Sequence, residues 1–224
     1  MKILYIGPIN YGETCHQRML ALQELGHYII VINTLPPEVK KKYDGFLYRL
    51  IRKIYGPLDF ANINKQIEEY IKFGQIDLLW IDKGLTVYPE TLLHVKQKFP
   101  NTIIAGYSPD DMTGNSNNQS RNFLNSLSYY DIYFTTKSYC VEELKALGCS
   151  KVIFVNNAFD PHIHKPLRIT DEERIKLGGP VGFIGDYEKE RASMLINLAQ
   201  HSILVPVGSP YSNKDAVLSK VYKH

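Results

Sequence analysis

Short apolar runs of strand length recur along this chain, and amphipathic helical segments separate them. The expected strands are residues 2–6, 28–32, 78–81, 102–105, 132–135 and 152–155. The expected helices are residues 14–25, 38–55, 60–73, 89–98, 120–127 and 138–147. Strands that alternate with helices and are apolar on both faces form a parallel sheet covered on both sides. The sequence therefore predicts an α/β fold with a doubly wound parallel sheet.

Several of the expected helices have residues at their ends that are typical of helix caps. Thr14 and Gln17 fit a capping box, and Ser138 is placed to cap the helix that follows it. Gly26 and Gly148 stand where a glycine commonly closes a helix in the left-handed conformation. These residues define where we expect the first and the last of the six helices to begin and end.

The composition of the chain changes after residue 157, where prolines, a Gly-Gly pair and many charged residues occur. We expect an N-terminal domain over 1–165, a linker over 166–180 and a second α/β unit over 181–224. The expected elements of this second unit are strands at 181–184 and 203–207 and helices at 187–200 and 213–222. Two strands and one or two helices cannot cover both faces of a sheet. The second unit is therefore expected to be the truncated start of another α/β domain.

Composition excludes several classes of function. A net charge of +3 with scattered basic residues does not indicate a nucleic-acid-binding protein, and the cluster Lys40–Lys42 is interpreted as a solvated helix face. The three cysteines form no CxxC pair, and His162 and His164 have no evident further ligands, so neither disulfides nor a metal site are expected. No apolar run is long enough for a transmembrane segment or a signal peptide. We expect a cytoplasmic protein.

Ligands of open parallel sheets bind beyond the carboxyl ends of the strands, so the loops there supply the candidate residues. In the first loop, Gly7, Asn10 and Gly12 lead to a helix N-terminus that suits phosphate or sugar oxygens. The alternative is a tight turn without a ligand. His16 follows and is a candidate base, although a lone histidine is more often structural. Lys83, after the third strand, would bind an anion or pair with its neighbour Asp82.

The loop after the fourth strand is the most distinctive. Its adjacent carboxylates, Asp110 and Asp111, are candidates for the general base that removes a proton from a hydroxyl group. Asn118 and Gln119 suit a hydroxyl-rich ligand. The alternative is that one of the carboxylates caps a turn and that the amides are ordinary loop residues. The candidates that follow the fifth and sixth strands are Lys137 and Asn157.

Three segments resemble the CgeB-like (spore-maturation-type) glycosyltransferases of the GT-B class. They are ILYIGPINYGETCHQRMLALQELGH near the start, the run YSPDDMTGNSNNQSRNFLNSLSYYDIYFTTKSYCVEELKALGCSKVIFVNNAFDPHIHKPL over 107–167, and VGFIGDYEKERASMLINLA. The resemblance implies two Rossmann-like domains facing across a cleft, with the acceptor on the N-terminal side and a nucleotide-sugar on the C-terminal side. It also implies that Gly185 and Arg191 lie near the donor phosphates, with covering the helix surface as the alternative role of Arg191. No cofactor or metal is implied beyond the nucleotide-sugar, which is a co-substrate.

The function expected from this resemblance is transfer of a sugar, as by a hexosyltransferase, from a nucleotide-sugar to an acceptor hydroxyl. Family members continue well beyond the last residue here, so the chain is expected to be incomplete as a catalyst. The alternative is a non-catalytic Rossmann-like binding or interaction fragment that self-associates through its unfinished second domain. A weaker alternative is a nucleotide-dependent epimerase or reductase, because Tyr133 and Lys137 have the Tyr-x-x-x-Lys spacing.

Overall fold

The computed structural model of the chain describes residues 1–43, 45–114, 118–177, 183 and 189–200. The chain divides into two compact units, Met1–Asp160 and Pro161–His224. The candidate residues of the first six loops all belong to the first unit.

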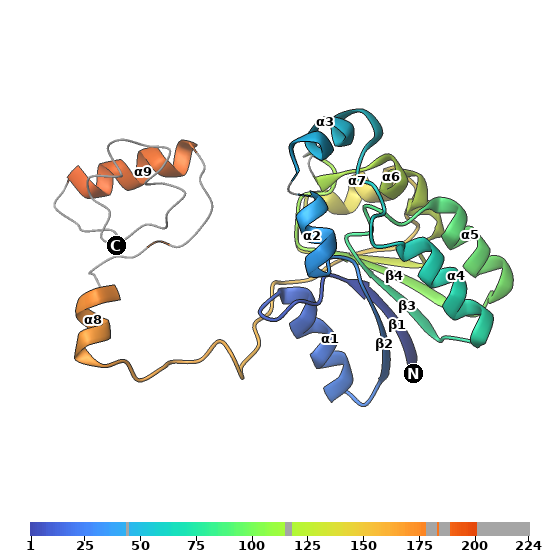
Figure 1. The fold of residues 1–224 in the computed structure, drawn as a ribbon, viewed down its shortest axis with the longest axis horizontal. Helices are drawn as coiled ribbons and strands as arrows, with labels where there is room; N and C mark the ends of the chain where they lie inside the picture. The colour runs from blue at the N-terminus through green and yellow to red at the C-terminus, as the bar shows by residue number, and fades with distance from the viewer. Residues whose placement is uncertain (44, 115–117, 178–182, 184–188, 201–224) are drawn as a thin grey trace. The chain divides into compact units, whose positions relative to one another are not determined.

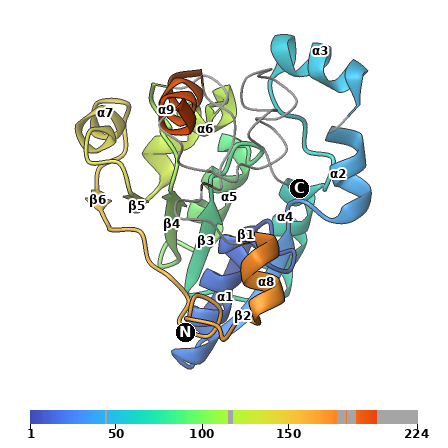
Figure 2. The same cartoon turned by 90° about the vertical axis from the view of Figure 1, so that its left-hand side faces the viewer.

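The first unit is built on a six-stranded sheet in which every neighbouring pair of strands is parallel. The strands are β1 (Lys2–Gly7), β2 (Tyr28–Asn33), β3 (Leu78–Asp82), β4 (Ile103–Ser108), β5 (Ile132–Thr135) and β6 (Val152–Phe154). Their spatial order is β2-β1-β3-β4-β5-β6 (Figures 1 and 2). The structure thus confirms the predicted parallel α/β fold.

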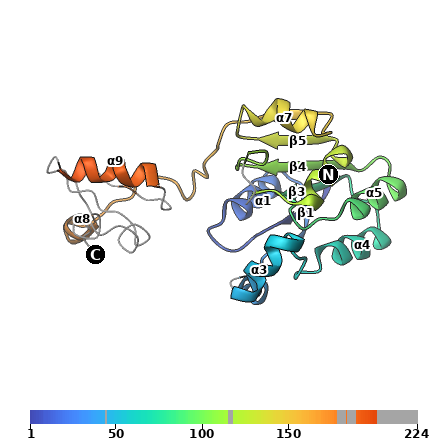
Figure 3. The same cartoon turned by 90° about the horizontal axis from the view of Figure 1, so that it is seen from above.

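Helices cover both faces of this sheet, as a doubly wound fold requires. They are α1 (Thr14–Glu24), α2 (Pro37–Tyr43), α3 (Phe46–Tyr55), α4 (Ile63–Phe73), α5 (Pro89–Lys98), α6 (Arg121–Ser126) and α7 (Cys140–Ala146), with a short 3-10 helix, η2, at Leu127–Tyr129. Helix α1 lies on one face of the sheet, and α4 and α5 lie on the opposite face (Figures 1 and 3). The helices that connect successive strands therefore move to the other face of the sheet after β2.

The two faces of the sheet have different cores. The face under α4 to α7 is mostly aliphatic, with fully buried residues such as Leu4 and Leu79, and it also holds buried rings such as that of Tyr133. The face under α1 is aromatic. Trp80 stacks at ring-centroid distances of 6.4 Å on Tyr5 and 5.8 Å on Phe134. Residues alternate between these faces along each strand, which explains why the strands look apolar throughout in the sequence.

The strand order creates one topological switch point, between β1 and β3. The chain leaves β1 through α1 to reach β2 on one side, and later returns to β3 on the other side of β1. Loops diverge at such a point and leave a crevice outside the carboxyl ends of the strands, where ligands of open α/β sheets bind. The loops after β1 and β3 flank this point.

The helix ends confirm some of the predicted caps and contradict others. Gly26 and Gly148 have φ angles of +81° and +113° and close α1 and α7, as predicted. The predicted capping box of Thr14 and Gln17 is wrong, because Glu13 takes the N-cap position and no side chain caps the helix. The predicted cap by Ser138 is also wrong, because α7 begins only at Cys140.

Two predicted segments also differ from the structure. The single helix expected over 38–55 is divided into α2 and α3, because Gly45 is extended and takes the N-cap position of α3. In the second unit, helix α8 (Asp171–Leu177) lies inside the expected linker 166–180. Thr170 and Glu173 form a reciprocal capping box at its start, with hydrogen bonds of 3.1 and 2.8 Å. This local pattern is sufficient to explain why a helix begins there.

Helix α9 (Lys189–Gln200) corresponds to the helix expected over 187–200. The strand expected at 181–184 is described only at Phe183, and the strand at 203–207 and the helix at 213–222 lie outside the described residues. Among the helices that the structure describes, none is long and apolar enough to cross a membrane.

Candidate functional site

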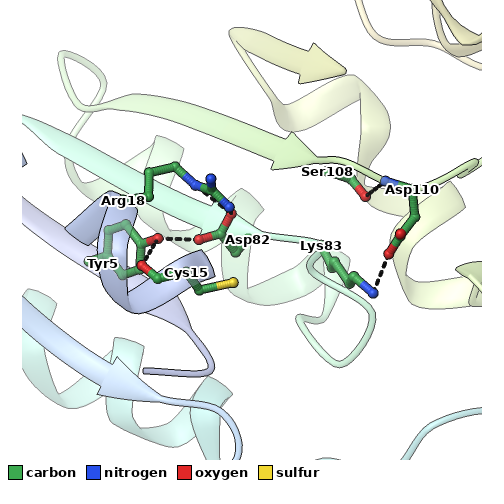
Figure 4. Close-up of polar contacts among 7 residues, drawn as sticks. All are labelled: Tyr5, Cys15, Arg18, Asp82, Lys83, Ser108 and Asp110. Carbon is green, nitrogen blue, oxygen red and sulfur yellow. Dashed lines mark hydrogen bonds and ion pairs between the residues drawn. The ribbon is translucent and has the colours of Figure 1, made fainter. Parts of the chain in front are cut away.

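A buried ionic cluster occupies the switch point between β1 and β3. Asp82, the last residue of β3, has a side chain that is only 1% exposed, and its Oδ1 accepts hydrogen bonds from Nε and Nη2 of Arg18 at 3.2 and 3.1 Å. The Tyr5 hydroxyl lies in hydrogen-bonding contact with Asp82 Oδ2 and 2.8 Å from the carbonyl oxygen of Cys15 (Figure 4). Both carboxylate oxygens of Asp82 therefore have partners, as a buried charge requires.

The cluster strongly perturbs the acid–base properties of its members. Burial and the negative charge of Asp82 raise the pKa of Tyr5 and raise the pKa of the Cys15 thiol to about 12. Burial acts to lower the pKa of Arg18, but the charge of Asp82 outweighs it and the pKa is raised. Tyr5 and Cys15 therefore stay protonated, and Arg18 stays charged, at any physiological pH.

Arg18 also fixes the position of β4. Its guanidinium lies over the Tyr107 ring, 3.7 Å from the ring centroid. A planar guanidinium can stack on an aromatic ring while its edge still donates hydrogen bonds. One side chain of α1 thus joins the end of β3 to the end of β4.

Lys83 follows Asp82 and has an unusual backbone conformation, with a φ of +63°. Its amide donates to the carbonyl oxygen of Tyr107 at 2.8 Å, which continues the β3–β4 pairing. Its ammonium group forms an ion pair with Asp110 in the loop after β4 (Figure 4). The suggested pairing of Lys83 with Asp82 is therefore wrong, because Asp82 is turned into the interior toward Arg18.

The loop after β3 packs on a buried tyrosine hydroxyl. Gly84 has a φ of +73°, and a Cβ placed on it would lie 2.6 Å from the hydroxyl oxygen of Tyr130. This hydroxyl and that of Tyr133 are buried and have no hydrogen-bond partner in the described structure. Only glycine fits at position 84, both for its conformation and for its space.

Asp111 and Asp110 play different parts in the loop after β4. Asp111 Oδ1 accepts hydrogen bonds from the backbone amides of Gly114 and Thr113, at 2.7 and 3.0 Å, and these bonds lower the pKa of its carboxyl. This is the turn-capping arrangement that the sequence left open as an alternative. Within the described part of this loop, the Asp110 carboxylate accepts no backbone hydrogen bond, and the Asp110 amide donates to Ser108 Oγ at 3.1 Å. Asp110 therefore presents its carboxylate to Lys83 at the edge of the sheet.

The first loop is tied to its neighbours. A Cβ at Gly7 would lie 3.2 Å from both Asp82 and Tyr5, so a glycine allows the close approach of the two strand ends. Asn10 Nδ2 donates at 3.0 Å to Glu13 Oε1 and at 3.0 Å to the carbonyl oxygen of Leu35, after β2. Gly12 is left-handed, with a φ of +85°.

The other candidates lie on α1 and in the loops after β4, β5 and β6. His16 and Lys137 are half-buried, and Asn157 is exposed, after β6. Among the residues the structure describes, the His16 and Asn157 side chains form no hydrogen bond or ion pair. Asn118 is half-buried in the loop after β4, where the Gln119 side chain donates to the carbonyl oxygen of Thr113.

The donor-side candidates belong to the second unit. Gly185 lies outside the described residues. Arg191, on α9, lies 5.3 Å from the centroid of the Phe183 ring. In the described parts of the chain, no group of three or more His, Cys, Asp or Glu side chains is placed to hold a metal ion.

The structure thus brings Gly7, Lys83 and Asp110 to one edge of the sheet through a continuous series of contacts. Gly7 approaches Asp82, the next residue Lys83 pairs with Asp110, and Asp111 shapes the same loop. Sequence reasoning missed Arg18, Tyr5 and Tyr107. The sequence does contain a pattern that indicates the buried ion pair. An arginine lies one turn into the first helix, and an aspartate is the last residue of a central strand.

Comparison with known proteins adds no family to this description. No family model matches the chain, and no curated protein matches it.

Proposed function

We propose that the chain is the acceptor-side part of a GT-B-type glycosyltransferase that transfers a sugar from a nucleotide-sugar to an acceptor hydroxyl. One observation carries the proposal: the contacts that run from Gly7 through Asp82 and Lys83 to Asp110, along the carboxyl edge of a parallel sheet at its switch point. Binding sites of open α/β sheets lie at this place. The resemblance of the same loops to CgeB-like enzymes supplies the chemistry.

Asp110 is the general base in this proposal. As the acceptor oxygen bonds to the anomeric carbon and the bond to the diphosphate breaks, the acceptor proton passes to the Asp110 carboxylate. Lys83 fixes the direction of this carboxylate through the ion pair. His16 is the alternative base, because it lies on the first turn of α1, directly after the loop that follows β1.

Asp111 has a positioning role instead. A carboxylate that accepts backbone hydrogen bonds and has a lowered pKa is a weak proton acceptor, so we assign it to holding the loop that carries Asp110. Gly7, Asn10 and Gly12 form the backbone wall on the β1 side. Asn118, Gln119, Lys137 and Asn157 are proposed as further contacts to the acceptor.

The leaving diphosphate would be stabilised from the second unit. By the resemblance, Gly185 and Arg191 are the residues proposed to contact it, through a helix N-terminus and a guanidinium. Such groups stabilise charge that develops only as the donor bond breaks.

The experiment is a donor-consumption assay with the purified chain. UDP-glucose, UDP-N-acetylglucosamine and GDP-mannose are offered in turn, with a simple hydroxyl acceptor series, and release of the nucleoside diphosphate is measured. The proposal expects release with one donor class above the rate without protein, although more slowly than from a complete enzyme, because the chain is expected to be incomplete as a catalyst. Absence of release with every donor, in a chain that folds cooperatively, contradicts it.

A second candidate function is a sugar- or nucleotide-binding module without chemistry. One observation favours it: both carboxylates of the loop after β4 already have partners, Asp110 with Lys83 and Asp111 with backbone amides. Calorimetric binding of a nucleotide-sugar without any release of diphosphate would select this function over transfer.

A further inference from the structure

Helix α3 is amphipathic and exposes a row of large apolar side chains. Leu47 is 69% exposed, Leu50 46% and Ile54 70%. These positions are spaced three, four and seven residues apart, so they lie together on one face of the helix. Contiguous exposed apolar residues of this size mark an interaction surface more often than scattered single ones do.

The opposite side of α3 is firmly attached to the first unit. Tyr48 is buried, and its ring lies 5.0 Å from that of Tyr43 on α2 and 5.4 Å from that of Phe60, measured between ring centroids. The exposed residues therefore belong to an anchored helix and not to a loose end. Figures 2 and 3 show α3 at the periphery of the unit Met1–Asp160, away from the strands.

The same segment concentrates positive charge. Residues 37–55 contain six basic and two acidic residues, a net charge of +4, whereas the whole chain has a net charge of +3. The rest of the chain is therefore slightly acidic. Lys40, Lys41 and Lys42 are exposed on α2, next to α3. An apolar helix face beside a group of lysines is the pattern of helices that lie in a membrane interface.

We propose that α2 and α3 form a peripheral membrane-binding surface for anionic phospholipids. The side chains of Leu47, Leu50 and Ile54 enter the boundary between headgroups and acyl chains, and Lys40–Lys42 contact the headgroup phosphates. Charge favours this partner over a second copy of the chain, because a symmetric dimer through this face would place the basic clusters of both copies together. The proposal does not depend on transferase activity.

Vesicle co-sedimentation of the full chain tests it. Sucrose-loaded vesicles of phosphatidylcholine with phosphatidylglycerol are compared with vesicles of phosphatidylcholine alone, at low and at high salt. We expect the protein to pellet with the anionic vesicles, and to do so less at high salt because the lysine–phosphate attraction is screened. Equal pelleting with both compositions, or pelleting with neither, overturns the proposal without any variant.

Matched variants locate the surface. Leu47→Gln with Ile54→Gln removes exposed apolar groups, and Leu25→Gln with Phe73→Gln, at residues 72% and 88% exposed, is its control. The variant Lys40→Gln/Lys41→Gln/Lys42→Gln is matched by Lys65→Gln/Lys72→Gln/Lys98→Gln, which removes the same charge elsewhere. Each α2–α3 variant should lower the vesicle partition coefficient by about tenfold or more, and each control by less than about twofold.

Two further results would decide against the proposal. One is an equal loss in the α2–α3 variants and in their controls. The other is a dimer, seen by light scattering of the wild type, that dissociates in the Leu47→Gln/Ile54→Gln variant while vesicle binding is unchanged; that result assigns the face to a second copy. Circular dichroism checks that the variants fold, which is expected because the substituted side chains are exposed.

Discussion

The carboxylate of Asp82 accepts two hydrogen bonds from the guanidinium of Arg18, although the two residues are 64 positions apart in the sequence. One residue ends β3 and the other lies in the second turn of α1. The pair connects the two elements that diverge at the switch point, and Arg18 extends the connection to β4 by stacking on Tyr107. The strand ends that carry the proposed site are therefore fixed by a buried ion pair.

The first prediction concerns that pair. Arg18→Met should lower the free energy of unfolding by about 3 kcal/mol, because it leaves the Asp82 carboxylate buried and unpaired. Adding Asp82→Asn should recover part of the loss, since a neutral amide costs less to bury. Urea unfolding measures both. Lys83→Met, which breaks a partly exposed pair, is the comparison and should cost less than about 1 kcal/mol. Equal losses in Arg18→Met and Lys83→Met would refute the assignment.

The second prediction concerns the reactivity of Cys15. A pKa of about 12 leaves very little thiolate at pH 8, so the thiol should react with a disulfide reagent about a thousandfold more slowly than an unperturbed cysteine. Asp82→Asn removes the neighbouring negative charge and should speed the reaction. Reaction rates are followed by absorbance in native protein and in urea, with Cys15→Ser to identify the phase. A native rate as fast as the rate in urea contradicts this account.

The third prediction uses the contact between Gly84 and Tyr130. Gly84→Ala should destabilise the fold by about 2 kcal/mol, because alanine is strained at this φ and its Cβ would meet the Tyr130 hydroxyl. Tyr130→Phe alone should change stability by less than about 1 kcal/mol, since the buried hydroxyl has no partner within the described residues. Combined with Gly84→Ala, it should recover part of the loss.

The control for this pair of substitutions is Gly45→Ala. Gly45 has a φ of −65°, which alanine readily adopts. Its substitution should cost less than about 1 kcal/mol in the same thermal or urea measurement. If Tyr130→Phe gives no recovery in the Gly84→Ala background, the steric part of the explanation is wrong.

The fourth prediction is a pH dependence. The pKa of Asp111 is lower in the folded protein than in the unfolded chain, where it is about 4. Its contribution to stability is therefore fully present above pH 4 and is lost as the pH falls through the folded value. The stability difference between wild type and Asp111→Ala should be constant near neutral pH and shrink in acid. A difference that grows below pH 4 would have the wrong sign.

The sequence was sufficient to predict the sheet and most of its helices. The segments 89–98 and 132–135 match Pro89–Lys98 and Ile132–Thr135 residue for residue. Both have local causes: a proline in the first helical turn, and a short apolar run between turns. The prediction of the N-cap residue failed at Thr14. Several neighbouring residues can take the N-cap position, and the sequence pattern does not select one of them.

The site was predicted less completely, for a physical reason. Lys83 and Asp110 were chosen as candidates because parallel topology places the ends of β3 and β4 together. The ion-pair partner of each charged residue depends on the face of the sheet to which its side chain points. At the ends of the strands, the sequence pattern does not specify this direction. Asp82 points to the α1 face and Lys83 leaves the strand with a positive φ, so two adjacent residues pair with groups far apart in the chain.

The most direct test of the proposed function compares two carboxylate variants in the donor-consumption assay. Asp110→Asn removes the proposed base, and Glu142→Gln removes another surface carboxylate that pairs with a lysine, Lys145. The account predicts that Asp110→Asn lowers the rate of diphosphate release by about a hundredfold or more while Glu142→Gln leaves it unchanged. An Asp110→Asn variant that releases diphosphate at the wild-type rate would contradict the proposal that this edge of the sheet is the catalytic site.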